Sequence, residues 1–296
     1  MTQFLELTLS GLALGAIYAL IAMGFVLVFK ATGIVNFAYG SLLLLGAYVA
    51  AKLQGDLSFW LAMLCGAGAA ALGALLIELV LMRHMRGTDA GILAILTLGV
   101  DVLMATELTR RIGSDILESG APWGSEVVRL GDVAIPETRV AAGVVALLII
   151  GAFSAAFKYT DWGVAMRAAA ADGKTAALMG IRFNRVAASA WALAGSLAAV
   201  AGVFFTSFPA PGVDNTTGLA ALAAIPAAVI GGLDSIAGAL VGGIIIGLVA
   251  TYCAGYQDDL SFLGRGLGEI APYTVMLLVL LIKPSGLFGT QSVTRV

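Results

Sequence analysis

Two short glycine-containing strings in this sequence resemble nucleotide-binding motifs. GKT at 173–175 looks like the end of a phosphate-binding loop, in which backbone N–H groups and a lysine hold phosphates. That motif begins with a glycine where this chain has Ala168, and no buried strand precedes it. GLGEIA at 266–271 imitates a dinucleotide fingerprint, but it also lacks a preceding strand and runs into Pro272. We therefore predict no nucleotide site in this chain.

Candidate metal ligands and nucleophile–base sets are few. His84 is the only histidine, and it lies between Arg83 and Arg86 without the further ligands that zinc needs. Cys65 and Cys253 both fall in apolar segments, where a thiol is typical of a small core hydrophobe. The sequence therefore predicts no catalytic residue and no metal, and it favours a protein that is not an enzyme.

Four carboxylates lie inside apolar segments, where an ionisable group is costly and is a functional candidate by default. Glu78 and Glu107 are near the segment ends and are expected at the membrane interface. Asp101 lies deeper and is expected to hydrogen-bond across a helix bundle. Asp234 precedes Ser235, and we expect it to cap the helix that begins there.

Asn36 lies between two glycines in the apolar segment GIVNFAYGS, residues 33–41. A buried amide costs free energy unless it is hydrogen-bonded, so we expect Asn36 to cap or stitch a helix start. Two interpretations stay open: contact with a transported solute, or a purely structural hydrogen bond between helices. On the first interpretation, the predicted pathway residues are Asn36, Phe37, Tyr39, Gly231, Gly232, Asp234 and Ser235.

The composition explains why these polar residues need internal partners. Of the 296 residues, 60% are hydrophobic and only 11% are charged, against roughly 25% charged in soluble domains. So little polar surface cannot cover so large a core in water, which implies that lipid is the solvent. The net charge of −2 argues against nucleic acid, because that partner requires a basic surface.

Long apolar stretches predict the elements that position these residues, since a helix needs ~20 apolar residues to cross ~30 Å of hydrocarbon. We predict an all-α membrane protein, a polytopic bundle of about eight transmembrane helices in a single domain over residues 1–296. The stretch 219–254 is interrupted by GGLDS at 231–235, so it is either two spans or a re-entrant broken segment. Its Gly-xxx-Gly pairs at 238/242 and 243/247 are expected to be packing contacts. The other spans are predicted at 7–29, 33–52, 57–82, 90–108, 139–157, 186–208 and 267–283.

The distribution of Lys and Arg predicts the orientation. With the N-terminus outside, ten of these residues fall on the inner side and six on the outer side, as the positive-inside rule favours. The first apolar stretch is expected to be a retained span, because no basic segment or cleavage site precedes it. The segment 109–138 is then a long external loop, with short β-like runs at 126–130 and 132–135.

The segment 158–185 is polar, yet it is rich in the helix formers Ala and Met. We predict two short helices, joined near residues 172–173 and docked on the cytoplasmic face. A strongly helical polar segment suits contact with a partner protein. The alternative is a solvated loop that only connects two spans.

A series of short strings now indicates a family. They are GAIYAL at 15–20, GIVNFAYG at 33–40, GAY at 46–48, AALMGI at 176–181, AGSLA at 194–198, AG at 201–202, IGGLDS at 230–235, GA at 238–239, GG at 242–243 and PSGLFG at 284–289. Each is weak alone, but their order along nearly the whole chain is specific. The chain resembles the permease subunits of ATP-binding-cassette importers for branched-chain amino acids, in particular the smaller of their two membrane subunits.

The resemblance implies an assembly in a bacterial inner membrane, with the N-terminus outside and the C-terminus in the cytoplasm. Its implied partners are a sister permease, two cytoplasmic ATPases that bind ATP and Mg²⁺, and an external solute-binding protein. This chain itself is expected to bind no cofactor. The segment 158–185 becomes the coupling segment, whose short helix sits in a groove of the ATPase. The implied coupling residues are Arg167, Lys174, Ala176, Ala177, Gly180, Ile181 and Arg185.

Two departures from the family pattern and two alternatives remain. Tyr39 stands where the family usually has His, and KTA at 174–176 stands where it commonly has Glu-Ala-Ala, which removes one acid from the expected ATPase contact.

Relatives of this class carry urea, amides, or aromatic and other carboxylic acids, so the solute stays open. An ion-coupled secondary transporter is the alternative of another class, which predicts an inverted repeat and a central carboxylate. We find no convincing repeat.

Overall fold

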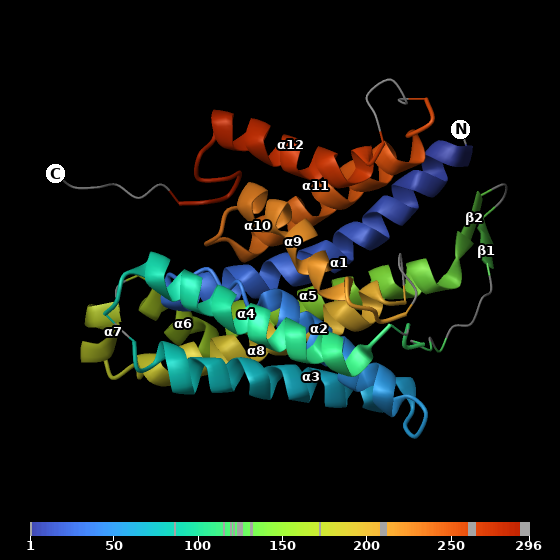
Figure 1. The fold of residues 1–296 in the computed structure, drawn as a ribbon. Coiled ribbons are helices and arrows are strands. Elements are labelled where there is room, and N and C mark those ends of the chain that lie inside the picture. Colours follow the sequence, from blue (N-terminus) through green and yellow to red (C-terminus); the bar gives the residue numbers. More distant parts are fainter. Residues whose placement is uncertain are drawn as a thin grey trace.

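The computed structural model describes residues 2–85, 87–114, 116–118, 120, 122, 127–130, 133–171, 173–207, 212–259 and 265–290. Within these residues the chain is a helical bundle with one small β-hairpin (Figure 1). The elements are α1 Thr2–Thr32, α2 Tyr39–Leu53, α3 Phe59–Leu76, the π-helical η1 Ile77–Met82, α4 Ala90–Ile112, β1 Val127–Leu130, β2 Val133–Pro136, α5 Glu137–Tyr159, α6 Asp161–Ala171, α7 Gly173–Leu178, α8 Phe183–Phe205, the 3₁₀ turn η2 Thr217–Leu219, α9 Ala220–Ala223, α10 Ile225–Gly231, α11 Ile236–Gly255 and α12 Leu267–Ile282.

Among the described residues, six helices are long and apolar enough to cross a bilayer: α1, α3 with η1, α4, α5, α8 and α11. Three shorter apolar stretches accompany them: α2, residues 217–231, and α12. This arrangement confirms the predicted all-α, polytopic class. The stretch 219–254 resolves into short, interrupted helical pieces that end at Gly231, followed by α11, which is long enough to span.

One predicted span has the wrong start. The apolar run 33–52 was expected to be helical throughout, but helix α2 begins only at Tyr39. The chain leaves α1 through Gly33, whose φ is +70°, a left-handed conformation that glycine adopts without steric cost. Residues 33–38 then form a non-helical segment that leads into the bundle.

Helix α1 lies at the centre of the bundle and packs against α11, α8 and α5. Its contact with α11 is backbone to backbone. A Cβ on Gly15 would lie 2.8 Å from Ile244 Cα, and one on Gly243 would lie 2.5 Å from Ala19 Cα. Lipid provides no hydrophobic force between helices, so such close approach is what holds them together. The prediction that these Gly-xxx-Gly pairs are packing contacts is confirmed.

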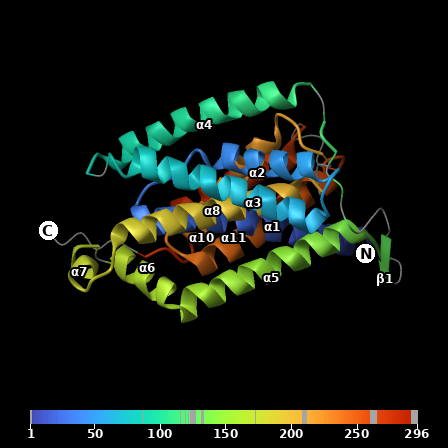
Figure 2. The same cartoon turned by 90° about the horizontal axis from the view of Figure 1, so that it is seen from below.

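The two ends of the bundle carry different structures (Figures 1 and 2). The N-terminus and the antiparallel β1–β2 hairpin lie at one end, which we call the hairpin end. Helices α6 and α7 lie at the other, which we call the α7 end. The hairpin matches the two β-like runs, apart from residues 126 and 132, which are outside the described part. Two short helices are also found where they were predicted, and Asp172 between them is likewise outside the described residues.

Candidate functional site

Helix α2 begins inside the bundle, beside the middle of α4. The Phe37 N–H donates to Thr97 Oγ1 at 3.0 Å, and the Ser41 N–H donates to Asp101 Oδ1 at 2.9 Å. The first N–H groups of a helix have no partner within it, and lipid supplies none. Thr97 and Asp101 are one turn apart on α4, so one face of that helix satisfies both groups. The prediction that Asp101 hydrogen-bonds across the bundle is confirmed.

Asn36 supplies a third acceptor at this helix start. Its side chain is buried, and Oδ1 accepts a hydrogen bond from the Ala38 N–H at 3.0 Å. Asn36 therefore forms a turn that leads into α2, whose N-cap residue, Ala38, has no side-chain cap. The Nδ2 group of Asn36 and the hydroxyl of buried Tyr39 have no hydrogen-bond partner among the described residues. Each such atom costs about 1–3 kcal/mol, so a polar partner that reaches either of them would gain free energy.

Tyr39 reaches into α1, where its ring packs against Phe25 at a centroid distance of 4.6 Å. The Tyr39 hydroxyl group occupies the space that a Cβ at position 24 would need, so a glycine is required there. The large Tyr39 ring is thus accommodated by a glycine on the facing helix.

A cavity of about 90 Å³ adjoins the α2 start. Its wall is mostly apolar, with few polar groups. Gly40 and Gly218 meet there, and a Cβ on Gly40 would lie 2.9 Å from the Gly218 oxygen. The lining residues are Phe25, Phe37, Gly40, Ser41, Leu44, Asp101, Ala105, Asn215, Gly218, Leu219, Ala221 and Leu222. Of the predicted pathway residues, only Phe37 lines this cavity.

The break at 231–235 lies elsewhere, toward the α7 end. Gly232 has a φ of +101° and ends α10. Ser235, and not Asp234, caps α11, because Ser235 Oγ accepts from the Gly238 N–H at 3.0 Å. The prediction that Asp234 caps this helix is wrong, and the adjacent residue has that role.

Asp234 instead joins three segments. Its Oδ2 accepts hydrogen bonds from the Thr290 N–H at 3.0 Å and from the Thr290 hydroxyl. The Lys30 ammonium, at the end of α1, donates to the Asp234 carbonyl at 2.6 Å. Partial burial acts to raise the pKa of Asp234, but the Thr290 hydrogen bonds and the Lys30 charge outweigh it and lower the pKa. The carboxylate is therefore ionised at neutral pH.

A cavity of about 630 Å³ lies at the α7 end. It is lined by both Arg167, a predicted coupling residue, and Asp234, a predicted pathway residue. Arg167 donates to the Phe157 and Lys158 carbonyls at the end of α5. In the first turn of α6, the Trp162 Nε1–H donates to Ser189 Oγ of α8 at 2.8 Å. Helix α6 is therefore hydrogen-bonded to both α5 and α8.

The predicted coupling residues of α7 form its C-terminal cap. The Ile181 N–H donates to the Ala176 carbonyl and the Gly180 N–H to the Ala177 carbonyl, both at 3.0 Å. Gly180 has a φ of +85°. This is the Schellman arrangement, which requires a left-handed residue at that position. Arg185 is exposed nearby, and the side chain of Lys174 lies outside the described part.

Sequence reasoning missed the most exposed apolar side chains of this segment. Leu178 and Met179, at the tip of α7, are 88% and 80% exposed. Beside them is a groove of about 560 Å³ that includes Gly180, Ile181 and Arg185. The only sequence signal was two large apolar residues in a polar segment, directly before the capping glycine. Thr97 and Lys30 were also missed, although Thr97 precedes Asp101 by one helical turn.

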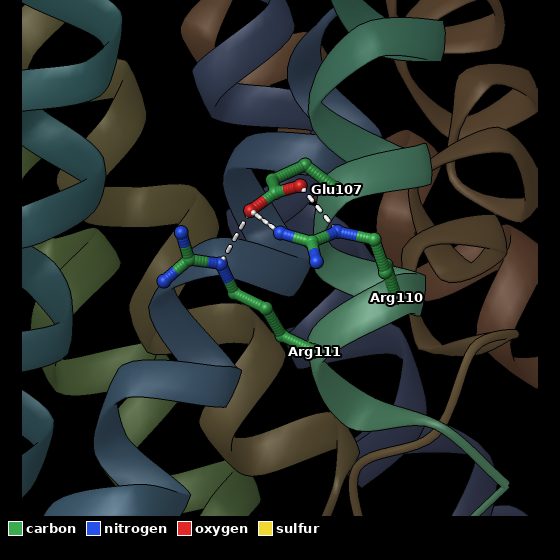
Figure 3. Close-up of polar contacts among 3 residues, drawn as sticks. All are labelled: Glu107, Arg110 and Arg111. Atoms are coloured by element: carbon green, nitrogen blue, oxygen red, sulfur yellow. Dashed lines mark hydrogen bonds and ion pairs between the residues drawn. The ribbon is translucent and has the colours of Figure 1, made fainter.

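The two remaining carboxylates occupy different surroundings. Glu107 is half-exposed at the hairpin end of α4 and binds Arg110 and Arg111, with N–O distances of 2.9 and 2.7 Å (Figure 3). This suits its expected interfacial position. Glu78 is fully buried in the π-helical turn, 3.4 Å from Arg83. Its side chain lies inside the protein, beside that of Arg83.

The six long apolar helices make this chain a multi-pass membrane protein. Comparison with known proteins shows the family to which it belongs. The family model described as branched-chain amino acid transport system, permease component, matches residues 7–282. The chain belongs to this family.

Relatives agree over nearly the full length. The chain is 31% identical to the high-affinity branched-chain amino acid transport system permease protein LivH of Escherichia coli, covering 99% of this chain and 98% of that one. It is 29% identical to permease protein BraD of Pseudomonas aeruginosa, with the same coverage. It is 31% identical to a probable branched-chain amino acid transport permease protein of Methanocaldococcus jannaschii, over 92% and 88%. No solved structure matches.

Proposed function

We propose that this chain is the membrane-spanning permease subunit of an ATP-binding-cassette importer in a bacterial inner membrane. It passes a branched-chain or related amino acid from an external binding protein to the cytoplasm. Membership of the permease family over residues 7–282 carries this proposal, together with relatives from three genera that are named for branched-chain amino acid transport.

The solute path runs past the start of α2. The small, mainly apolar cavity there holds little fixed charge, which suits a subunit that must release what it receives. Asn36 and Tyr39 each bury one unpartnered polar atom close by, and Asp101 faces the cavity. Phe37 also lines this cavity and belongs to the same part of the path. Gly231, Gly232, Asp234 and Ser235 form the inner portion, where the broken helix meets the α7 end.

Residues 158–185 couple this path to the ATPases. The exposed Leu178 and Met179 insert into a partner groove, while Arg167 and Arg185 face its rim. Because α6 is hydrogen-bonded to the end of α5 and to α8, displacement of the tip moves both helices. The shared cavity of Arg167 and Asp234 extends the same movement to the broken helix.

The surrounding assembly follows from the same proposal. The hairpin end, with the loop 109–138, faces outward toward the solute-binding protein, and the α7 end faces the cytoplasm. Two ATPases bind ATP and Mg²⁺, a sister permease completes the membrane unit, and this chain binds no cofactor. The positive-inside distribution supports the orientation.

The test is leucine uptake into proteoliposomes that contain this chain, its sister permease and both ATPases. Uptake is expected only with ATP on the ATPase side and the binding protein on the other. Omission of either should abolish it, and unlabelled isoleucine or valine should compete where urea does not. Competition by urea or benzoate in place of the aliphatic amino acids would contradict the proposed solute.

A further inference from the structure

The chain turns back after α12 and returns to the end of the short helix α10 (Figure 1). The Leu287 N–H donates to the Ile230 carbonyl at 2.7 Å, and the Phe288 N–H donates to the Gly231 carbonyl at 3.0 Å. Carbonyls in the last turn of a helix have no partner within it, and lipid supplies none. Residues 284–290 therefore satisfy groups that α10, with seven residues, leaves open.

Glycines bring the two backbones into direct contact. A Cβ on Gly286 would lie 2.6 Å from the Val229 oxygen, and one on Gly232 would lie 2.6 Å from the Gly289 nitrogen. Gly286 and Gly232 also have φ angles of +78° and +101°, a region that residues with a side chain rarely adopt. The chain after α12 is thus shaped to fit the end of α10.

The next residues extend the contact to the break between α10 and α11. Thr290 donates from its N–H and its hydroxyl to the Asp234 carboxylate. The Asp234 carbonyl accepts from the Lys30 ammonium of α1. The end of the chain is therefore joined to both sides of the break, and through Asp234 to the central helix.

This contact lies beside water and open space. Phe288 is 49% exposed, and Thr290 is also exposed. Thr290 and Asp234 line the 630 Å³ cavity together with Arg167 and Gly173 of the coupling segment. Water can bond polar groups that separate here, so opening the contact costs far less than it would in hydrocarbon. The cavity leaves room for such a displacement.

We propose that residues 284–290 form a C-terminal latch on the broken helix. When the latch is closed, as in this structure, it holds α10 and the break in place. Movement of the coupling segment across the shared cavity releases it, so that α10 shifts and the inner end of the solute path opens. Resting on the proposed function and orientation, the latch adds a moving part between the coupling segment and the path.

Hydrogen exchange of the complete permease–ATPase assembly in lipid nanodiscs measures the latch directly. The amide hydrogens of Leu287 and Phe288 exchange only when their bonds to α10 open. Their exchange rate is followed without nucleotide, with a non-hydrolysable ATP analogue and during steady ATP hydrolysis. We expect the rate to differ several-fold between at least two of these states.

Two variants calibrate this measurement. Thr290→Val removes the hydroxyl that binds Asp234, and it should accelerate exchange several-fold in the most protected state. Ser285→Ala, in the same segment, removes a hydroxyl that makes no hydrogen bond within the described residues. It should exchange like the parent.

A reversible cross-link tests whether the latch must open for transport. Cys65 and Cys253 are replaced by Ala, and the Asp234→Cys/Thr290→Cys pair is bridged by a short bis-methanethiosulfonate reagent. We expect the bridge to stop ATP-driven leucine uptake and a reductant to restore it. The same reagent on Thr290→Cys alone cannot form the bridge and should leave the uptake of that variant as it was. Should the double variant fail to transport before treatment, hydrogen exchange decides alone.

Three results would overturn the latch: equal exchange at residues 287 and 288 in every nucleotide state, exchange in Thr290→Val equal to that of the parent, or uptake that continues in the cross-linked protein. ATP-driven uptake by the untreated parent, with binding protein added, tests the proposed function separately. Intact uptake combined with unchanging exchange would refute the latch alone.

Discussion

At the scale of single residues, the polar groups of this protein act mainly on backbone ends that lipid cannot satisfy. Thr97 and Asp101 accept the N–H groups at the start of α2, and Ser235 caps α11. Asn36 Oδ1 accepts a hydrogen bond from the nearby Ala38 N–H, and its Nδ2 donor has no partner among the described residues. The unused donor distinguishes a candidate solute contact from a residue whose bonds are all structural.

Asp101 offers a test of this role. Asp101→Leu should leave the Ser41 N–H without an acceptor and lower the free energy of unfolding by about 1–3 kcal/mol. Asp101→Asn retains an acceptor oxygen and should lie much closer to the parent. Thermal unfolding of the purified protein in detergent measures the difference, with Asp56→Leu in an exposed turn as control. Equal melting temperatures for the two Asp101 variants would refute the capping role.

Asp234 provides a pH-dependent test. Because its pKa is below the ordinary 3.8, the folded state favours the ionised carboxylate, and this stabilisation is fully present above the ordinary value. It is lost only as pH falls through the lowered pKa. Asp234→Asn should therefore be less stable than the parent by the same margin from neutral pH down to about pH 5.

The difference in stability between Asp234→Asn and the parent should disappear only in more acidic solution. Thermal unfolding of both proteins across this range is the measurement, with Thr290→Val as a second disruption of the same contact. A margin that already disappears between pH 7 and pH 5 would show that another group is responsible.

At the scale of elements, the sequence was most informative about long helices and least informative about where they are interrupted. Continuous apolar runs predict most of the spans, because hydropathy alone determines which segments enter lipid. The start of α2 was not predictable, since residues 33–38 are as apolar as the helix that follows. Their conformation depends on acceptors in α4, some 60 residues later along the chain.

The coupling segment shows the opposite case. Its two short helices were predictable from helix-forming residues and a central glycine, and the Schellman cap accounts for Ala176, Ala177, Gly180 and Ile181. The exposure of Leu178 and Met179 could not be inferred, because apolar residues usually turn inward. Leu178 is the last residue of α7, and Met179 follows it, directly before the capping Gly180.

Alanine substitutions test this tip. Leu178→Ala/Met179→Ala preserves helix propensity but removes the exposed apolar surface, and we expect it to uncouple ATP hydrolysis from uptake at least several-fold. Leu281→Ala/Ile282→Ala removes two equally exposed residues from the end of α12 and serves as the matched control. Uptake per ATP hydrolysed, measured in proteoliposomes, should fall only for the first pair. An equal effect of both pairs would contradict a docking role for α7.

At the scale of the whole molecule, α1 connects every functional region. Leu7, Ser10 and Leu14 in its N-terminal half line a cavity of about 570 Å³ at the hairpin end. Phe25 in its C-terminal half packs against Tyr39, and Lys30 in its last turn donates a hydrogen bond to the Asp234 carbonyl. The glycine contacts with α11 bind it to the element that follows the break. A single buried helix can therefore relay a movement of the α7 end to both cavities, as alternating access requires.

We propose that ATP hydrolysis on partner subunits drives solute through this permease. The most direct measurement is leucine uptake by the purified assembly, in vesicles with ATP and no ion gradient, and in vesicles with a proton or sodium gradient and no ATP. We expect leucine to accumulate in the first case and not in the second. Accumulation driven by a gradient without ATP would contradict it, and would make Asp101 the leading candidate for an ion-coupling site.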